Sequence, residues 1–302
     1  MGSNLVERYL LRGHDVLVLD NFATGRREVV PSGIRGLTVV EGSVADGALV
    51  ERCFSDFKPT HVIHAAAAYK DAGDWQEDAA TNVLGAIHVA RAAEACCVER
   101  IVNFQTVLIY GRPDQVPIPV DAPLRPFTSY AVSKAAGEQY MLMGAVPTVS
   151  LRLASVIGPR LGIGPIPTFY SRLKAGKACF CSDTRRDFLD MEDFFAAVDA
   201  ALCDDAPVGI FNISTGEGRS VKEVFDAVVA HLGVEPGEVP ILPPGNDDVR
   251  EVVLDPSKAR QHLGWSAKVG FKETMERVLT WYDAHGVSTI HSHLKPTAVS
   301  VS

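Results

Sequence analysis

The sequence predicts an α/β protein built on a doubly wound parallel sheet. Apolar runs of strand length alternate with segments of helical periodicity, and the connections between them are short. The apolar runs are continuous, as expected for strands that are covered on both faces. With 47% apolar residues in a chain of 302, the protein also has enough apolar side chains for a full core.

The elements alternate regularly over the first half of the chain. The predicted strands are residues 15–20, 37–41, 61–67, 100–106 and 148–154. The predicted helices are residues 3–12, 45–57, 77–97 and 128–144. After about residue 158 prolines interrupt the chain and the alternation loosens. We therefore expect a first domain over residues 1–158 and a smaller α/β cap over residues 159–302, parts of which return to the sheet.

Composition excludes several classes of function. The formal charge is −8 and the Lys and Arg residues are scattered, so neither nucleic acid nor a membrane surface is an expected partner. No run approaches the ~18–20 apolar residues of a membrane span, and the charged opening is unlike a signal peptide. The six cysteines lack zinc-site spacing, so we expect no metal and reduced thiols in a cytoplasmic protein.

A tyrosine and a lysine stand four residues apart in the predicted helix 128–144. Tyr130 and Lys134 would share one helix face, about 5–6 Å apart at Cβ. A neighbouring ammonium group favours the phenolate, so we expect Lys134 to lower the pKa of Tyr130 toward neutrality. Such a pair suits acid–base chemistry between an alcohol and a ketone. The alternative is an ordinary surface pair on an amphipathic helix.

A hydroxyl group ends the predicted strand 100–106. Thr106 would lie at the carboxyl edge of the sheet, where doubly wound folds bind their ligands. Together with Asp20 at a strand end, HAAA at 64–67 and TNVLGA at 81–86, these motifs resemble the extended short-chain dehydrogenase/reductase family. Within it they are similar to the nucleotide-sugar epimerases and dehydratases, over nearly the whole chain.

The resemblance implies a Rossmann-like fold with NAD as cofactor. In LDNFATG at 19–25, Asp20 would accept hydrogen bonds from the ribose hydroxyls, which favours NAD because a 2′-phosphate would be repelled. The alternatives are a helix-capping Asp20 and an ordinary helical Asn82. The cofactor residues that the resemblance implies are Gly2, Asp20, Asn21, Thr24, Gly25, Ser43, Val44, Ala65, Ala66, Ala67, Asn82, Tyr130 and Lys134. The catalytic residues that it implies are Thr106, Tyr130 and Lys134.

The segment RRDFLDMED at 185–193 is similar to the part of the family that holds the nucleotide diphosphate. Arg186 would be the clamp, a role that suits a bidentate guanidinium group. The alternative is a surface ion pair of Arg186 with Asp187 or Asp190. The substrate residues that the resemblance implies are Thr106, Ser155, Arg186, Arg250 and Val252. A bulky Val252 is compatible with exclusion of a 2-acetamido group.

The sequence departs from the family pattern at several positions. Ser43 stands where an Asp is usual, Ser155 where an Asn commonly meets the substrate, and Arg250 is only near the place of a second phosphate-binding arginine. Only Gly2 remains of the family's G-x-x-G-x-x-G loop, and the strand before it is missing. We therefore expect an N-terminally truncated sequence or a mis-called start, with unpaired strand edges as a consequence.

The residues after Thr106 reduce the number of reactions that the resemblance allows. Val107 and Leu108 stand where dehydratases and decarboxylases of the family carry a carboxylate. The resemblance therefore implies an isomerase, an NAD-dependent epimerase of a nucleotide-diphosphate sugar, most simply a UDP-sugar at C4 through a 4-keto intermediate. The alternatives are an NAD(P)H-dependent keto-sugar reductase or dehydrogenase and a non-catalytic NAD(P)-binding relative.

The motifs QT-x-x-x-YG and CFCSDTRRDF resemble a subgroup of epimerases from bacterial surface-polysaccharide biosynthesis. The resemblance also implies a homodimer. The predicted helices over 77–97 and 127–144, rich in alanine, would pair across a two-fold axis into a four-helix interface.

Overall fold

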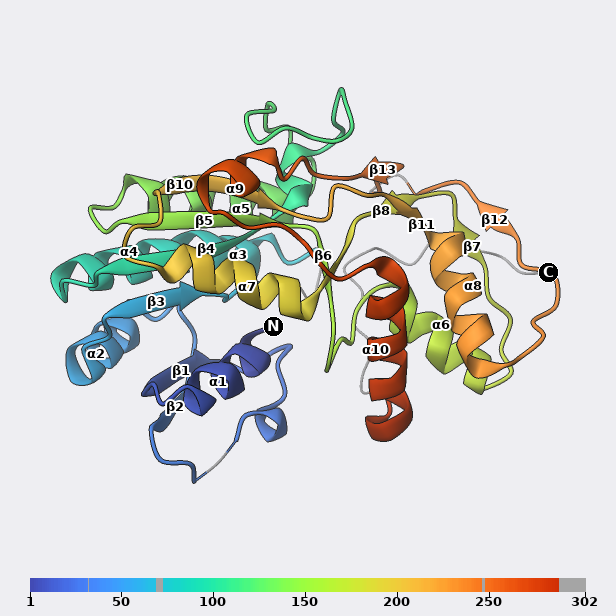
Figure 1. The fold of residues 1–302 in the computed structure, drawn as a ribbon. Coiled ribbons are helices and arrows are strands. Elements are labelled where there is room, and N and C mark those ends of the chain that lie inside the picture. Colours follow the sequence, from blue (N-terminus) through green and yellow to red (C-terminus); the bar gives the residue numbers. More distant parts are fainter. Residues whose placement is uncertain (32, 69–72, 246–247, 288–302) are drawn as a thin grey trace. The chain divides into compact units, whose positions relative to one another are not determined.

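The computed structural model describes residues 1–31, 33–68, 73–245 and 248–287 (Figure 1). The chain forms two compact units, each made of several stretches of sequence. Unit 1 comprises Met1–Ile109, Pro126–Arg152 and Val198–Phe211, and unit 2 comprises Tyr110–Arg125, Leu153–Ala197 and the chain from Asn212 onward. After Arg152 the chain leaves unit 1 and enters unit 2 at Leu153, a few residues before the boundary expected at residue 158.

The strands of unit 1 confirm the parallel α/β class. Strand β1 (Val16–Asp20) pairs in parallel with β2 (Leu37–Glu41), in a register that runs from Val16–Leu37 to Asp20–Glu41. Strand β3 (His61–His64) pairs in parallel with β4 (Arg100–Thr106). The latter two belong to a sheet of order β10-β5-β4-β3, with β5 at Thr148–Leu153 and β10 at Gly209–Ile213. Within the described residues, β1 and β3 each lie at an edge of their sheet.

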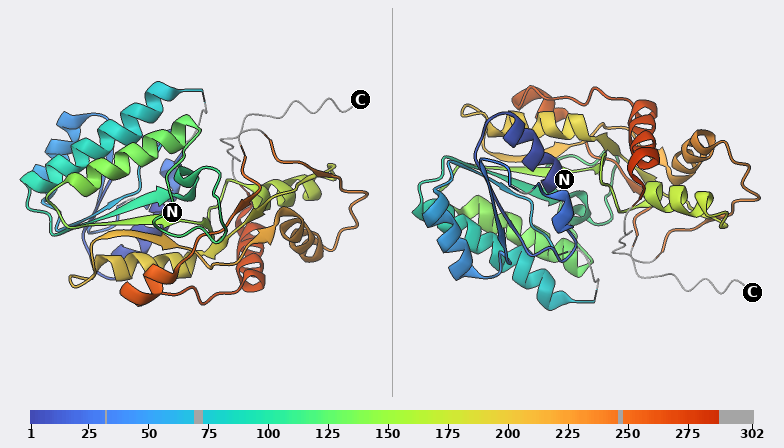
Figure 2. Two further views of the ribbon diagram at one scale, coloured as in Figure 1. Left: turned by 90° about the horizontal axis from the view of Figure 1, so that it is seen from above. Right: turned by 90° about the horizontal axis from the view of Figure 1, so that it is seen from below.

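Helices cover these strands. They are α1 (Gly2–Leu11), α2 (Gly47–Phe57), α4 (Gly85–Ala95) and α5 (Ser129–Met143), and a short 3-10 turn η1 covers Arg27–Val29. Figure 2 shows α4 and α5 side by side on one face of the four-stranded sheet. Their apolar faces join Val50 and Phe54 of α2 and Ile101 of β4 in one buried cluster. The strands β4 and β5 are buried almost throughout, and the buried residues include polar side chains such as Asn103, Ser150 and Arg152.

The segment expected as one helix over 77–97 is divided into three. It consists of α3 (Trp75–Asp78), a π-helical turn η2 (Ala79–Leu84) and α4. The close approach of α5 accompanies this change, because a Cβ on Gly137 would lie 2.1 Å from the carbonyl oxygen of Asn82. Only glycine permits that contact, and π turns of this kind interrupt α-helices frequently at functional sites.

Unit 2 consists of short strands and helices. The strands are β6 (Ser155–Ile157), β7 (Cys181–Ser182), β8 (Arg185–Arg186), β9 (Phe188–Asp190), β11 (Arg219–Ser220), β12 (Ile241–Leu242) and β13 (Glu251–Val252). The helices are α6 (Pro165–Lys174), α7 (Met191–Leu202, which continues into unit 1), α8 (Val221–Leu232), α9 (Ser257–His262) and α10 (Phe271–His285). A 3-10 turn, η3 (Val107–Tyr110), follows β4 at the end of the first stretch of unit 1. The strand orders are β11-β8-β13, β12-β7 and β6-β9.

The core of unit 2 lies between α6, α8 and α10. Phe169 of α6 meets Phe225 of α8 edge to face, with ring centroids 5.2 Å apart, and Val278 and Leu279 of α10 belong to the same buried cluster. None of the helices in the described part of the chain combines the length and the apolar character that a membrane crossing needs.

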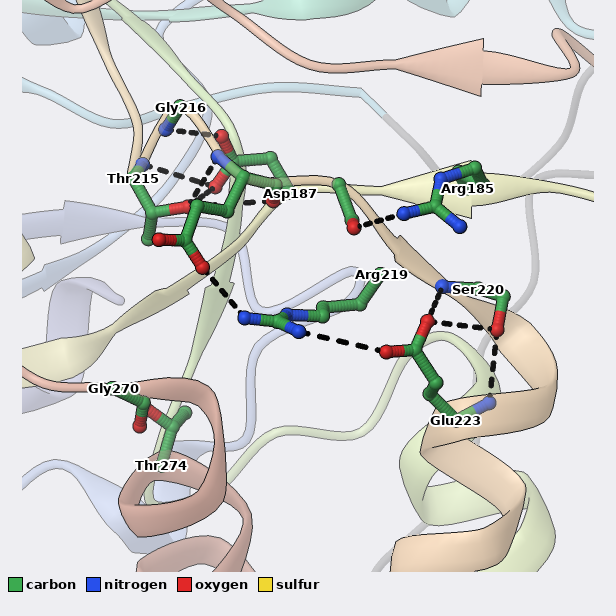
Figure 3. Close-up of polar contacts among 11 residues, drawn as sticks. Arg185, Asp187, Thr215, Gly216, Arg219, Ser220, Glu223, Gly270 and Thr274 are labelled. Carbon is green, nitrogen blue, oxygen red and sulfur yellow. Dashed lines mark hydrogen bonds and ion pairs between the residues drawn. The ribbon is translucent and has the colours of Figure 1, made fainter.

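Helix α8 begins with a reciprocal cap. The backbone N–H of Glu223 donates to Ser220 Oγ over 3.1 Å, and the Glu223 carboxylate accepts from the Ser220 N–H over 2.7 Å (Figure 3). Two N–H groups of the first turn are satisfied in this way.

We expect Ser220→Ala to lower the free energy of unfolding of unit 2 by about 1 kcal/mol, because the first turn of α8 loses its cap. Urea unfolding followed by circular dichroism measures this change. Ser55→Ala is the matched control, since Ser55 is exposed and its hydroxyl hydrogen-bonds within α2, to Arg52 O and Asp56 Oδ1. Equal losses for the two variants would contradict the capping role.

Candidate active site

Helix α5 and strand β4 bring the three predicted catalytic residues together. Thr128 caps α5 by accepting a hydrogen bond from the Ala131 N–H over 3.2 Å, and the helix carries Tyr130 and Lys134 on one face. Thr106 ends β4, and its side chain hydrogen-bonds to that of Tyr130. The juxtaposition that the spacing predicts is therefore present within unit 1.

Lys134 is buried against β4. Its side chain is 4% exposed, and its ammonium group donates to the carbonyl oxygen of Phe104 over 2.8 Å. Burial lowers the pKa of Lys134 to about 8, and the carboxylate of Glu138 opposes this shift. His64, at the end of β3, is also buried, and burial together with the Lys134 cation lowers its pKa to about 3. The imidazole beside Lys134 is therefore neutral at physiological pH.

The expected lowering of the Tyr130 pKa is wrong for this structure. Desolvation raises the pKa of Tyr130 above its ordinary value, and the carboxylate of Asp78 raises it further, while the hydrogen bond to Thr106 opposes both. The physical reason is that Lys134 directs its ammonium group to Phe104 O and does not offset the desolvation of the phenol. Tyr130 is consequently a protonated phenol here, a potential acid rather than a ready base.

The loop after β1 contains the predicted adenosine-binding segment. Asp20 is exposed at the carboxyl end of β1, and its Oδ1 accepts from the Phe22 N–H over 2.7 Å. Asn21 makes a similar turn with the Ala23 N–H at 3.1 Å. A Cβ on Gly25 would lie 3.4 Å from Asp20 Oδ2, so the loop folds back toward the Asp20 carboxylate. Thr24, the residue before Gly25, is exposed.

Asp20 does not cap a helix. The next helical turn, η1, starts after Arg26 without a side-chain cap, so that alternative is wrong. An exposed carboxylate at the end of a parallel strand fits a pair of ribose hydroxyls.

Of three other predicted cofactor residues, Ser43 and Val44 make contacts with nearby residues of unit 1, and Gly2 has free space around its Cα. Ser43 Oγ accepts from the Ala45 N–H over 3.1 Å, in the turn before α2. Val44 is buried, its carbonyl oxygen lies 3.0 Å from His88 Nδ1, and a Cβ on Gly85 would lie 2.5 Å from its side chain. Around Gly2, no described atom comes within 4 Å of an added Cβ, so the contacts within the structure do not require glycine there.

Asn82 is more than an ordinary helix residue. It is 3% exposed, its Oδ1 accepts from the Ala68 N–H at 2.9 Å, and its Nδ2 donates to Ser133 Oγ at 2.9 Å. Ser133 in turn donates to the carbonyl oxygen of Tyr130 over 2.9 Å. Asn82 thereby ties the segment after β3, with its small residues Ala65, Ala66 and Ala67, to the first turn of α5.

Arg186 has a partner that the sequence analysis did not name. Its side chain, on β8 of unit 2, is 19% exposed and forms an ion pair with Asp248. The proposed alternatives are wrong: Asp187 accepts from the Thr215 and Gly216 N–H groups, as Figure 3 shows, and Asp190 lies 3.4 Å from Arg277. Loop closure over about 60 residues brings Asp248 to β8, which local spacing does not reveal.

The remaining predicted substrate residues lie near β8 in unit 2. Val252 of β13 is buried and stands opposite Arg186 in the parallel register, while the Ser155 N–H donates to Asp187 O over 3.0 Å. Arg250 is exposed and pairs with Asp183 at 2.8 Å.

The arginines on the β11-β8-β13 sheet are all paired with carboxylates. Arg185 lies 3.5 Å from Glu251, and Arg219 lies 2.6 Å from Glu217 and 3.6 Å from Glu223; Figure 3 shows Arg219 reaching Glu223. Arg186 and Arg250 are paired as well, so each of these four guanidinium groups is oriented by a carboxylate.

Sequence reasoning missed several polar residues near Tyr130 and Lys134, namely His64, Asp78, Ser133, Glu138 and Arg152. Glu138 lies four residues after Lys134, so the same i, i+4 spacing that links Tyr130 to Lys134 would have indicated Glu138 as well. Asp78 similarly lies four residues before Asn82. No local pattern predicts Arg152, because β5 and α5 meet only through the fold.

Among the described residues, three potential metal ligands meet outside this region. One ligand atom from each of His61, Glu99 and Asp204 lies within 4.8 Å of the others. Two of these side chains are exposed acids, so the cluster does not by itself indicate an ion.

The comparisons with known proteins point to one family. The model of the NAD dependent epimerase/dehydratase family matches residues 1–214. The UDP-glucose 4-epimerase of Mycolicibacterium smegmatis is 31% identical, over 93% of this chain and 95% of the relative. UDP-arabinose 4-epimerase 1 of Arabidopsis thaliana is 29% identical, over 94% of this chain and 77% of the relative.

Solved structures give the same picture. The Bordetella bronchiseptica enzyme WbmG in complex with NAD and UDP has 61% sequence identity and a TM-score of 0.94, covering 97% of this chain and 95% of the neighbour. The Thermus thermophilus UDP-glucose 4-epimerase in complex with NAD has 33% identity and a TM-score of 0.83, covering 94% of this chain and 96% of the neighbour.

We expect Lys134 to titrate with a pKa of about 8, because burial disfavours its charged form. Lysine NMR with ¹³C at Cε measures this midpoint, and Lys134→Met assigns the signal by its loss. In the interval above pH 8 and below the ordinary lysine pKa, the unfolded chain binds a proton that the folded chain does not, so stability should rise with pH. A midpoint near 10 would contradict the buried placement.

Proposed function

The chain belongs to the NAD-dependent epimerase/dehydratase family, and on that premise we propose that it epimerises a nucleotide-diphosphate sugar at C4 with NAD. The observation that supports this proposal most directly is the meeting of Thr106, Tyr130 and Lys134 in unit 1. Relatives named for UDP-glucose and UDP-arabinose 4-epimerisation make a UDP-sugar the preferred substrate.

The residues present fit the proposed cofactor. Asp20 offers a carboxylate at a strand end for the ribose hydroxyls, and its negative charge disfavours a 2′-phosphate. The Lys134 ammonium group has three N–H donors, of which Phe104 O accepts one among the described residues, so a second ribose can be bound there. When bound, NAD supplies the acceptor and donor of hydride.

Tyr130 is proposed to move a proton between its phenol oxygen and the C4 oxygen of the sugar, while the Thr106 hydroxyl holds that same oxygen. The protonated phenol of the structure suits the half-reaction that returns a ketone to an alcohol. The opposite half-reaction needs the phenolate, and the hydrogen bond with Thr106 is the contact that favours that form.

Unit 2 would supply substrate binding. We propose that Arg186 binds the diphosphate in exchange for Asp248, with Arg250 as a second cation. Ser155 and Val252 would contact the sugar, and Val252 would disfavour a 2-acetamido group. The bidentate geometry of a guanidinium group suits a diphosphate.

We propose that the protein is a cytoplasmic homodimer and that it acts in surface-polysaccharide biosynthesis. Its six cysteines are free, as in reducing compartments. Large apolar side chains are exposed along η2 and α5, the segments expected at the two-fold axis: Leu84, Val132, Tyr140 and Met143. Contiguous exposed apolar surface marks interaction sites.

The first test is the cofactor content and activity of the purified chain. We expect near-stoichiometric NAD on heat release, C4 epimerisation of a UDP-sugar without added NADH, and a fall of about 10²–10⁴-fold in kcat for Tyr130→Phe. Tyr140→Phe, on the exposed face of the same helix, is the control and should keep full activity. Full activity of Tyr130→Phe, or strict dependence on added NADH, would overturn the epimerase proposal.

Reaction in deuterated water tests the hydride route. Because the hydride that leaves C4 is the one that returns, the product should carry no deuterium on carbon, as mass spectrometry measures. Incorporation of one deuterium at the inverted carbon would indicate a carbanion mechanism instead.

Light scattering tests the interface. The unsubstituted chain should have twice the monomer mass, and Met143→Glu should shift it to monomer because a charge would be buried in the contact. Leu11→Glu, a change on the exposed end of α1, should leave the mass unchanged. A monomeric unsubstituted chain would remove the proposal.

A further inference from the structure

A buried ion pair lies one helical turn beyond Lys134. Glu138 of α5 is fully buried and Arg152 of β5 is 3% exposed. Arg152 donates twice to the carboxylate, from Nε to Oε1 over 3.1 Å and from Nη2 to Oε2 over 2.6 Å. Tyr130, Lys134 and Glu138 are spaced by four residues, so they follow one another along one face of α5.

A hydroxyl network extends this pair to β4. Ser150 Oγ donates to Glu138 Oε1 over 2.7 Å, and Asn103 Nδ2 lies 3.3 Å from Ser150 Oγ. Asn103 and Ser150 are 1% and 0% exposed. The interior thus holds a carboxylate that accepts hydrogen bonds from two residues of β5, and Asn103 links one of them to β4.

We propose that Glu138, held by Arg152, is a positioning residue that keeps Lys134 both protonated and aligned with Thr106. The inference rests on the function proposed above, in which the Lys134 ammonium group binds a ribose of NAD. Neither residue of the ion pair needs to touch substrate or cofactor for this role.

The alignment follows from two anchors on consecutive turns of α5. Lys134 binds the carbonyl oxygen of Phe104 on β4, and Glu138 binds Ser150 and Arg152 on β5. Thr106 lies two residues beyond Phe104 on the same strand. A rotation or shift of α5 would break both anchors together, so the distance between Tyr130 and Thr106 is set by this pair of contacts.

The charge argument starts from the cost of burying an ammonium group. Desolvation disfavours the protonated form of Lys134, and the Glu138 carboxylate favours it. The other titratable groups that face this region are neutral His64 on β3, Asp78 on α3, Tyr130 on α5 itself and Arg152 on β5. Since a buried ion pair is a weak source of stability compared with apolar packing, its placement next to Lys134 favours a role in the site.

The test compares Glu138→Gln with the unsubstituted holoenzyme. Glutamine keeps the shape and the hydrogen bond from Ser150 but removes the charge. The Lys134 midpoint, measured by ¹³Cε lysine NMR, should move to lower pH, and the alkaline limb of kcat should move with it. On that limb, kcat should fall tenfold for each pH unit by which the midpoint moves, with KM little changed.

Two controls separate charge from packing. Ser150→Ala removes a hydrogen bond from Glu138 without changing charge, and it should lower stability but leave the Lys134 midpoint in place. Glu94→Gln makes the same charge change in the exposed pair with Arg91 (3.2 Å) and should alter neither midpoint nor kcat.

The double variant Glu138→Gln/Arg152→Met serves if the single variant does not fold, since it leaves no unpaired buried cation. It should still show the lower Lys134 midpoint. An unchanged midpoint in either folded variant would overturn the proposal. Absence of epimerase activity in the unsubstituted chain would contradict the proposed function separately, because the NMR titration does not depend on substrate.

Discussion

The burial of a lysine ammonium group under helix α5 constrains most of the surrounding structure. An ammonium group inside a protein must keep hydrogen-bond acceptors and a nearby opposite charge. The carbonyl oxygen of Phe104 provides the first and Glu138 the second. Glu138 then requires its own donors, which come from Arg152 and Ser150. A single buried cation thereby accounts for buried polar residues on α5 and β5 and for a backbone contact to β4.

The same helix sets the shape of its neighbour. Gly137 lets α5 approach the Asn82 carbonyl closely at the π turn of η2, and the Asn82 side chain reaches both Ala68 and Ser133. Gly137 and the Asn82 side chain therefore have complementary roles. One allows the close approach of the two helices, and the other holds the loop that follows β3.

The strands and helices of the first half were predictable because each depends on local periodicity. The predicted strand 100–106 matches β4 at both ends, and the helix 128–144 matches α5 within one residue. The division of 77–97 was not predictable, since it depends on a contact with Gly137 some fifty positions away.

Among the site residues, helical spacing predicted that Tyr130 and Lys134 share a face, and the family resemblance implied that Thr106, at a strand end, belongs with them. The protonation of Tyr130 did not, because it depends on desolvation and on Asp78, which the fold supplies. The partner of Arg186 was missed for a similar reason, since Asp248 arrives from a distant loop.

The paired arginines of unit 2 make the binding of an anion an exchange reaction. An anion that binds Arg186, as proposed above, would replace the carboxylate of Asp248, so the net gain in free energy would be a difference between two similar contacts. Dissolved salt screens both contacts, and their difference changes less with ionic strength than either alone. Selectivity then favours ligands whose charge and geometry exceed those of a single carboxylate, which disfavours small monovalent anions that are abundant in any cell.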